Sequence, residues 1–192
     1  MDNVKYVFLP AKEQTKFAIL RGIDRPIEEI TVSQICKNCH ISRPTFYTHF
    51  DSKYAIASWL FDLAAELYLI QIGRSLKWDT GVRGYFSLLY SEKRHLRYAF
   101  SNTPNKPSVE LQLEHRRDEF IKTLRDYKHL SIDDDLRFYA QYFAFSGNRF
   151  VVDWCLENMP TPPDLTTRYF TECMPTPLIE ALDRDTIELT YD

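Results

Sequence analysis

The chain opens with three short apolar-patterned segments that are separated by helix breaks. Between residues 11 and 23 the apolar positions fall at mixed three- and four-residue spacings, as in a half-buried helix. A second helix is predicted over 32–38 with Thr31 as its N-cap. Ser42 opens a third, with Pro44 in its first turn, where the missing N–H of proline costs nothing. The pattern therefore predicts a compact unit of three helices.

Longer helical patterns follow this unit. Asp51-Ser52-Lys53 predicts an N-cap for a long helix to about residue 72, because the apolar residues after it keep a 3.6-residue period. Two shorter helices are expected over 82–90 and 95–100, and a helix with one apolar face is expected to start at Ser108. With helices predicted throughout, the fold class is all-α.

The last third of the chain holds two candidate helices of different character. Residues 132–158 carry apolar side chains all round the helix, so this segment must be buried on several sides. The acidic run 133–135 at its start is favoured by the helix dipole. A final helical segment is expected over about 164–182, where Pro175 and Pro177 should kink it or end it early.

Composition supports a helical globular protein. The chain has 192 residues, of which 44% are hydrophobic and 15% aromatic, with only five glycines, and this balance favours packed helices over small all-β folds. The N-terminus lacks a signal peptide's apolar core, and no apolar run approaches a membrane span, so a cytoplasmic location without a membrane partner is expected. The net charge of −3 divides unevenly, because residues 1–55 carry eight Lys/Arg against six Asp/Glu.

Residues 36–40 spell the C-x-x-C-H signature of covalent haem attachment. The four cysteines of a cytoplasmic chain stay reduced, and cysteines on the inner face of a helix pair leave no room for a macrocycle. Zinc bound through Cys36, Cys39 and His40 would lack a clear fourth ligand. The two cysteines are therefore interpreted as small buried hydrophobes, and neither a metal nor a cofactor is expected.

The second and third helices are joined by a tight turn, and such a helix-turn-helix places its later helix in a major groove. Residues 31–53, TVSQICKNCHISRPTFYTHFDSK, resemble the N-terminal DNA-binding domain of TetR-family transcriptional regulators. His40 and Pro44 depart from the glycines that are commoner in that family. The resemblance implies a helix-turn-helix DNA-binding domain over 1–53 and a helical dimerisation and ligand-binding domain over 54–192.

Roles on the third helix follow from side-chain chemistry together with this resemblance. Ser42 caps a helix start that can accept a phosphate, Arg43 can bind guanine through two hydrogen bonds, and Thr45 can reach a base edge or a thymine methyl. Phe46 and Phe50 should face inward and hold the helix. Other polar tips and charges suit the phosphate backbone. The candidate DNA-binding residues are Thr31, Ser42, Arg43, Pro44, Thr45, Tyr47, His49 and Lys53.

The resemblance also implies that the last two helices, about 133–158 and 164–182, build a four-helix bundle across a twofold axis. A homodimer would place two recognition helices about one DNA turn apart, on a palindromic operator. An effector pocket is expected among the central helices, lined by aromatic residues with a few polar groups. Its candidate residues are Tyr68, Tyr85, Phe86, His95, Tyr98, Tyr139, Tyr142, Phe143, Arg149 and Trp154.

The sequence thus predicts a dimeric repressor that binds double-stranded DNA and is released from a palindromic operator by a small-molecule effector. The alternative is a DNA-binding co-regulator whose C-terminal domain binds a protein partner or no ligand, and the presence or absence of a ligand-sized cavity would separate the two. An enzyme is not expected, because no Ser/His/Asp or Cys/His set has an interpretable spacing.

Overall fold

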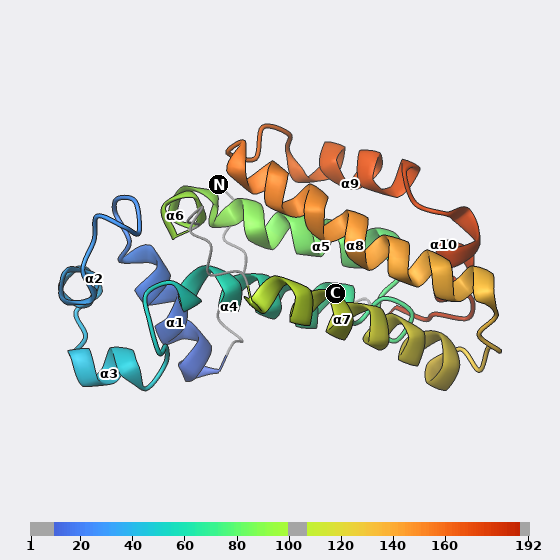
Figure 1. Cartoon of the computed structure of the whole chain (residues 1–192), viewed down its shortest axis with the longest axis horizontal. Coiled ribbons are helices and arrows are strands. Elements are labelled where there is room, and N and C mark those ends of the chain that lie inside the picture. The colour runs from blue at the N-terminus through green and yellow to red at the C-terminus, as the bar shows by residue number, and fades with distance from the viewer. Residues whose placement is uncertain (1–9, 100–106, 189–192) are drawn as a thin grey trace.

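The structure is a computed structural model, which describes residues 10–99 and 107–188, without the side chains of 107–114. The described residues form helices and contain no strand, which confirms the all-α fold class (Figure 1). The helices are α1 (Ala11–Arg21), α2 (Val32–Asn38), α3 (Arg43–Tyr47), α4 (Ala55–Ala64), α5 (Trp78–Ser91), α6 (Lys93–Ala99), α7 (Pro107–Lys122), α8 (Asp134–Leu156), α9 (Pro163–Glu172) and α10 (Thr176–Asp183). Two π-helical segments, η2 (Ala65–Leu69) and η3 (Thr123–Tyr127), continue α4 and α7.

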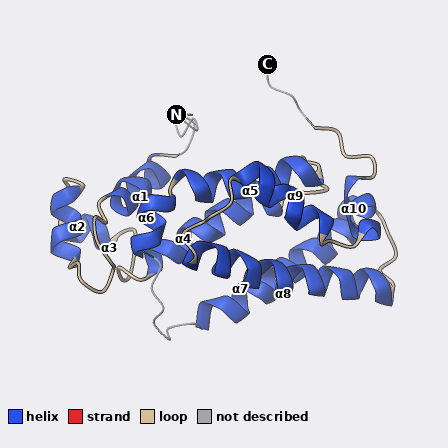
Figure 2. Ribbon diagram, turned by 90° about the horizontal axis from the view of Figure 1, so that it is seen from above, coloured by secondary structure: helices blue, strands red, loops and turns tan. Residues whose placement is uncertain are grey.

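Helices α1, α2 and α3 lie together at one end of an elongated molecule, and α5 and α7–α10 occupy the rest of it (Figure 1). Seen from above, α7 and α8 run side by side along one edge, while α5 lies next to α9 (Figure 2). Aromatic rings join these helices in the core, because Phe86 of α5 meets Trp154 of α8 and Phe170 of α9, each with ring centroids 5.3 Å apart. Helix α4 connects the two ends.

Three predicted helix boundaries were wrong. Neither Asp51 nor Ser52 caps α4, which follows Tyr54 without a side-chain cap. In the turn before it, Lys53 points to another element, since its Nζ donates to Ile30 O at 2.8 Å. The regular α-helix that begins there ends at Ala64 and gives way to the π-helical segment η2.

The third correction concerns α5, which begins at Trp78, four residues before the predicted start. Asp183 of α10 supplies the cap that the local sequence does not show, since its Oδ1 accepts a 2.6 Å hydrogen bond from Trp78 N. Helix α9 ends at Glu172 and α10 follows with Pro175 as its N-cap, so the prolines divide the last segment as predicted. The end of the predicted helix at residue 100 lies outside the described residues.

None of the helices in the described ranges combines the length and the hydrophobicity needed to cross a membrane. The same residues bring together no group of three or more His, Cys, Asp or Glu side chains that could hold a metal ion.

Candidate DNA-binding surface

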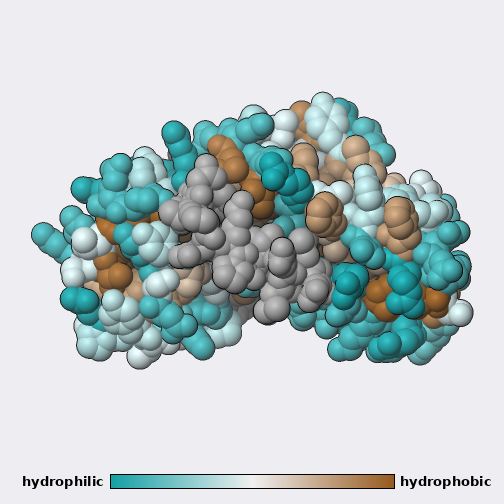
Figure 3. Space-filling model, viewed as in Figure 1, coloured by the Kyte–Doolittle hydropathy of each residue, from teal (hydrophilic) through white to brown (hydrophobic). Residues whose placement is uncertain are grey.

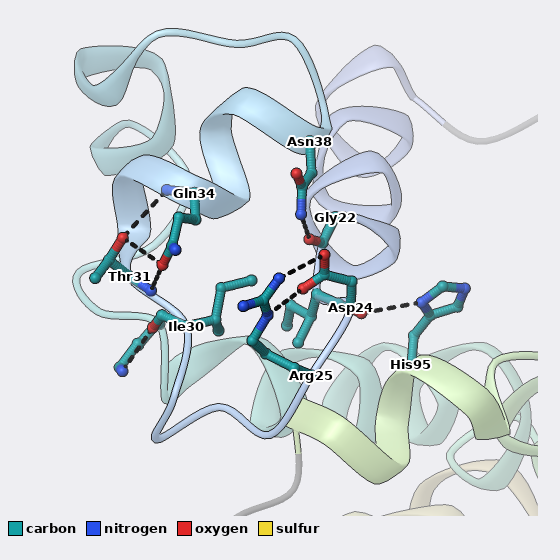
Figure 4. Close-up of polar contacts among 10 residues, drawn as sticks. Gly22, Asp24, Arg25, Ile30, Thr31, Gln34, Asn38 and His95 are labelled. Carbon is teal, nitrogen blue, oxygen red and sulfur yellow. Dashed lines mark hydrogen bonds and ion pairs between the residues drawn. The ribbon is translucent and has the colours of Figure 1, made fainter.

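Helix α2 begins with a complete capping box. The backbone N–H of Gln34 donates to Thr31 Oγ1 at 3.2 Å, and Gln34 Oε1 accepts a 2.8 Å bond from Thr31 N (Figure 4). Such a reciprocal pair satisfies two backbone donors that a helix start leaves free. Thr31 was predicted as the N-cap but the role of Gln34 was not, although Thr-x-x-Gln ahead of an apolar run is the usual signal of this motif.

The turn between α2 and α3 depends on His40 and Ser42. His40 has a φ of 56°, in the left-handed region where the family more often has glycine, and this conformation closes α2 sharply. Ser42 then caps α3, because its Oγ accepts a 3.1 Å hydrogen bond from Thr45 N, with Pro44 in the first turn. Three local features thus start the five-residue helix α3: the left-handed turn at His40, the Ser42 cap and the proline in the first turn.

The inner face of α3 is anchored in the core of the N-terminal region. Phe46 is fully buried and Phe50 is 5% exposed, as predicted. Trp59 of α4 packs edge-on against Phe50 with ring centroids 5.7 Å apart, so the first turns of α4 belong to this core. The predicted boundary between residues 53 and 54 therefore separates Phe50 and Trp59, which touch; the two domains remain a prediction.

The two cysteines of the C-x-x-C-H stretch face inward. Cys36 is buried and Cys39 half-buried, and Cys39 Sγ lies 3.1 Å from the carbonyl oxygen of Ile35. Burial raises the pKa of both thiols, and the charge of Arg43 only partly offsets this at Cys36. Protonated buried thiols fit the interpretation as small hydrophobes and are poor metal ligands.

The outer face of α3 presents the candidate base-reading side chains to solvent. Arg43 is exposed and its guanidinium forms no hydrogen bond or ion pair with any described residue. Tyr47 is 48% exposed, with its ring edge-on to Phe46. The hydroxyl of Thr45 lies 2.8 Å from Ser42 Oγ, so the two share one hydrogen bond at the helix start. Pro44 is exposed beside them.

The remaining candidates are placed less freely. His49 is half-buried, and its buried Nδ1 has no hydrogen-bond partner. Lys53 binds the carbonyl oxygen of Ile30, the residue before Thr31, so it lies at the start of α2 but is already engaged. The structure therefore brings Lys53 and Thr31 together at one helix start and Ser42 to Tyr47 together on another.

Side chains from other elements hold this unit in place, and the sequence did not reveal them. Asn38 Nδ2 donates to Gly22 O at 2.8 Å, which ties the end of α2 to the end of α1 (Figure 4). Arg21 of α1 forms an ion pair with Glu92, and His95 Nδ1 lies 3.4 Å from Ile23 O. The three-helix unit is thus joined to α6 and to the residue that precedes it.

The predicted pocket residues do not form one site. Tyr85, Phe86 and Phe143 line a common cavity between α5, α7, α8 and α9. His95 is at the junction just described, and Arg149 is exposed and paired with Asp153. These two cannot serve as polar anchors of that cavity.

The other five candidates lie elsewhere or serve the core. Tyr142 is 46% exposed on α8, and Trp154 is buried with its Nε1 donating to Thr161 Oγ1 at 3.1 Å. Tyr68 is half-buried against Gly84, and Tyr98 and Tyr139 are half-buried elsewhere. Sequence reasoning missed Arg116 and Asn148, which line the cavity with Tyr85. The signal was present, because Arg116 is four residues before Phe120 and so interrupts the apolar face of its helix.

Residues 23–58, which include α2, α3 and the start of α4, match the family of bacterial regulatory proteins of the tetR type. Over these residues the chain is similar to TetR-family regulators. The match confirms the resemblance carried by residues 31–53.

Curated relatives point the same way. The chain is 35% identical over 99 residues to HTH-type transcriptional regulators named EthR from Mycobacterium tuberculosis strains CDC 1551 / Oshkosh and ATCC 25618 / H37Rv, and to that of Mycobacterium bovis. The matched part covers 44% of this chain and 46% of each relative, so the chain spans less than half the length of the relatives it matches. The TetR-family likeness is therefore a statement about one part of the chain.

Proposed function

We propose that this chain is a TetR-type transcriptional regulator that binds double-stranded DNA through α3. The observation that carries the proposal is the two-sided construction of α3, in which Phe46 is fully buried while Arg43 and Tyr47 are exposed at the far end of the molecule (Figure 1). A helix held from beneath and polar on its outer face can enter a major groove, where an arginine reads guanine through two hydrogen bonds. Ser42, Pro44 and Thr45 would lie against the DNA at the start of this helix.

The protein would act as a homodimer on a palindromic operator. Helix α8 supports this, because Phe138, Tyr142 and Phe145 lie on one side of it and are 63%, 46% and 68% exposed. In the space-filling view, apolar residues are also exposed among the hydrophilic ones along α8 (Figure 3). A contiguous aromatic stripe of this kind favours contact with a second copy, which would supply the second recognition helix.

We place the protein in the cytoplasm, in contact with the DNA that it regulates, and expect repression that a small-molecule effector relieves. Tyr85, Phe86 and Phe143 give the cavity the aromatic lining that such a pocket needs. One observation favours the alternative, a co-regulator that takes no ligand. The cavity is small, with a volume of only about 20 Å³. That space holds about one water molecule.

The test is selection of bound fragments from a random DNA pool, followed by affinity measurements against salt concentration. We expect a palindrome, bound with a steep salt dependence, and Arg43→Ala should weaken binding by about 1–3 kcal/mol with relaxed preference at one base of each half-site. Arg25→Ala is the matched control, since Arg25 is an exposed arginine of the same region that is paired with Asp24. Failure of the folded natural protein to enrich any sequence would contradict DNA recognition by α3.

A further inference from the structure

The cavity between α5, α7, α8 and α9 contains a buried cation that lacks a counter-ion. Arg116 of α7 is 6% exposed, and none of the ion pairs among the described residues involves it. Its Nη1 donates to Asn148 Oδ1 at 3.2 Å, whereas Nη2 has no hydrogen-bond partner. A buried guanidinium without a carboxylate is costly, and a residue used only for packing would not need the charge.

A second buried polar group belongs to a residue that lines the same cavity. The side chain of Tyr85 is 1% exposed, and its hydroxyl has no hydrogen-bond partner of regular geometry. Burial raises the pKa of Tyr85 to about 12, whereas the neighbouring Arg116 acts against this through its charge and through a weaker hydrogen-bond interaction, so the hydroxyl keeps its proton. A guanidinium without a carboxylate and a protonated phenol hydroxyl therefore lie beside each other among the residues that line this cavity.

We propose that Arg116 and Tyr85 form the polar end of an effector site for the carboxylate of a small organic acid, with Asn148 orienting the guanidinium. A guanidinium binds a carboxylate through two parallel hydrogen bonds, which matches a side chain whose Nη2 is free and whose Nη1 is held at one side only. The rest of the lining is apolar, with Leu69, Phe143 and Phe170 around the polar end, so the remainder of the acid would be hydrocarbon. The effector role rests on the proposed function; the binding itself does not.

The apolar lining must move to admit such a molecule. Leu69 is the last residue of the π-helical segment η2, and π-helical turns are often found at functional sites. Gly147 has no side chain on the α8 wall of the cavity, and the ring of Phe170 packs against it instead. The Cζ of Phe170 lies 3.1 Å from the position that a Cβ of residue 147 would take. Displacing this ring would enlarge the cavity and shift α9 against α8.

The test is calorimetric titration of the full-length protein with acetate, hexanoate and benzoate, each compared with its neutral amide. We expect at least one acid to bind and its amide to bind far more weakly. Arg116→Met should lower the affinity for the acid by about thirtyfold or more. It should leave the melting temperature of the free protein unchanged or higher, because it removes an uncompensated buried charge. Tyr85→Phe should lower the affinity for the acid without lowering the stability of the protein.

Arg117→Met is the matched control, because Arg117 is the next residue but its guanidinium is 37% exposed and paired with Asp118. The proposal is overturned if no acid binds, if acid and amide bind equally, as a merely hydrated cavity would allow, or if Arg116→Met melts lower and binds the acid unchanged. Titrating the same preparations with selected DNA separates the two proposals. DNA binding without acid binding rejects only the acid site, and acid binding without DNA binding rejects only the regulator.

Discussion

Replacing His40 by glycine should stabilise the protein, because His40 occupies the turn between α2 and α3 with a φ of 56°. The left-handed conformation costs a non-glycine residue about 1–2 kcal/mol, whereas glycine adopts it freely but loses about 0.5–1 kcal/mol through the greater entropy of its unfolded chain. The imidazole is exposed, so its removal sacrifices no packing. The free energy of unfolding of His40→Gly should therefore rise by about 0.5–1 kcal/mol.

The assay is urea denaturation followed by helical circular dichroism, supported by a melting temperature that should rise by about 1–4 °C for a chain of this length. His40→Ala is the matched control, because it removes the same imidazole but keeps the Cβ that makes the left-handed region costly. Its stability should not rise. Equal stabilisation by alanine and glycine would show that the imidazole, and not the backbone, is responsible, and the reasoning would be refuted.

Three further predictions concern other local devices. Thr31→Ala should lower the free energy of unfolding by about 1 kcal/mol through loss of the capping box, and Thr31→Ser should keep it, as measured by urea denaturation. Gly84→Ala should destabilise by about 1–3 kcal/mol despite alanine's better helix propensity, because the new methyl meets the Tyr68 ring; failure of Tyr68→Ala to relieve the loss would contradict this. Arg74 holds the pKa of Glu119 below its usual 4.5, so the ion pair stabilises the fold fully above that pH and less as the pH falls through the lowered pKa. Arg74→Gln should therefore lower the free energy of unfolding near neutrality, and this loss should be smaller at about pH 3.

The N-terminal region was predictable because its signals are local. Thr31, Ser42 and Pro44 start helices through contacts within four residues. The inward position of Phe46, predicted from its chemistry together with the resemblance, is confirmed. Asn38 escaped prediction because its partner, Gly22, is sixteen residues away and no local pattern shows a bond of that range.

The cavity was poorly predicted because its polar groups come from separate helices. Residue type alone suggested His95 and Arg149, but whether a charge is buried depends on which helix face packs against which neighbour. The exposed Arg149 is satisfied by Asp153 one turn away, whereas Arg116 is buried among α5, α8 and α9. A charged residue inside an apolar helix face is a local sign of a buried polar site, and it is a better predictor of such a site than a charge near aromatic residues.

Dimerisation can be tested through the two faces of α8. Phe138, Tyr142 and Phe145 are spaced by four and three residues, so they form one stripe, while Phe143, which belongs to the other face, is buried in the chain's own core. The double variant Phe138→Ser, Phe145→Ser should therefore leave the fold intact but shift the protein to a monomer in analytical ultracentrifugation. Ile187→Ser is the control, because Ile187 is 81% exposed but lies outside α8.

Loss of the dimer should carry through to DNA binding. Two recognition helices can reach successive half-sites only when a twofold axis holds them about 34–36 Å apart, so the monomeric variant should bind single half-sites weakly and lose its advantage on a palindrome. Arg43→Ala, by contrast, should weaken binding while the dimer persists. A double variant that remains dimeric and binds the palindrome unchanged would show that the α8 stripe faces something other than a second copy.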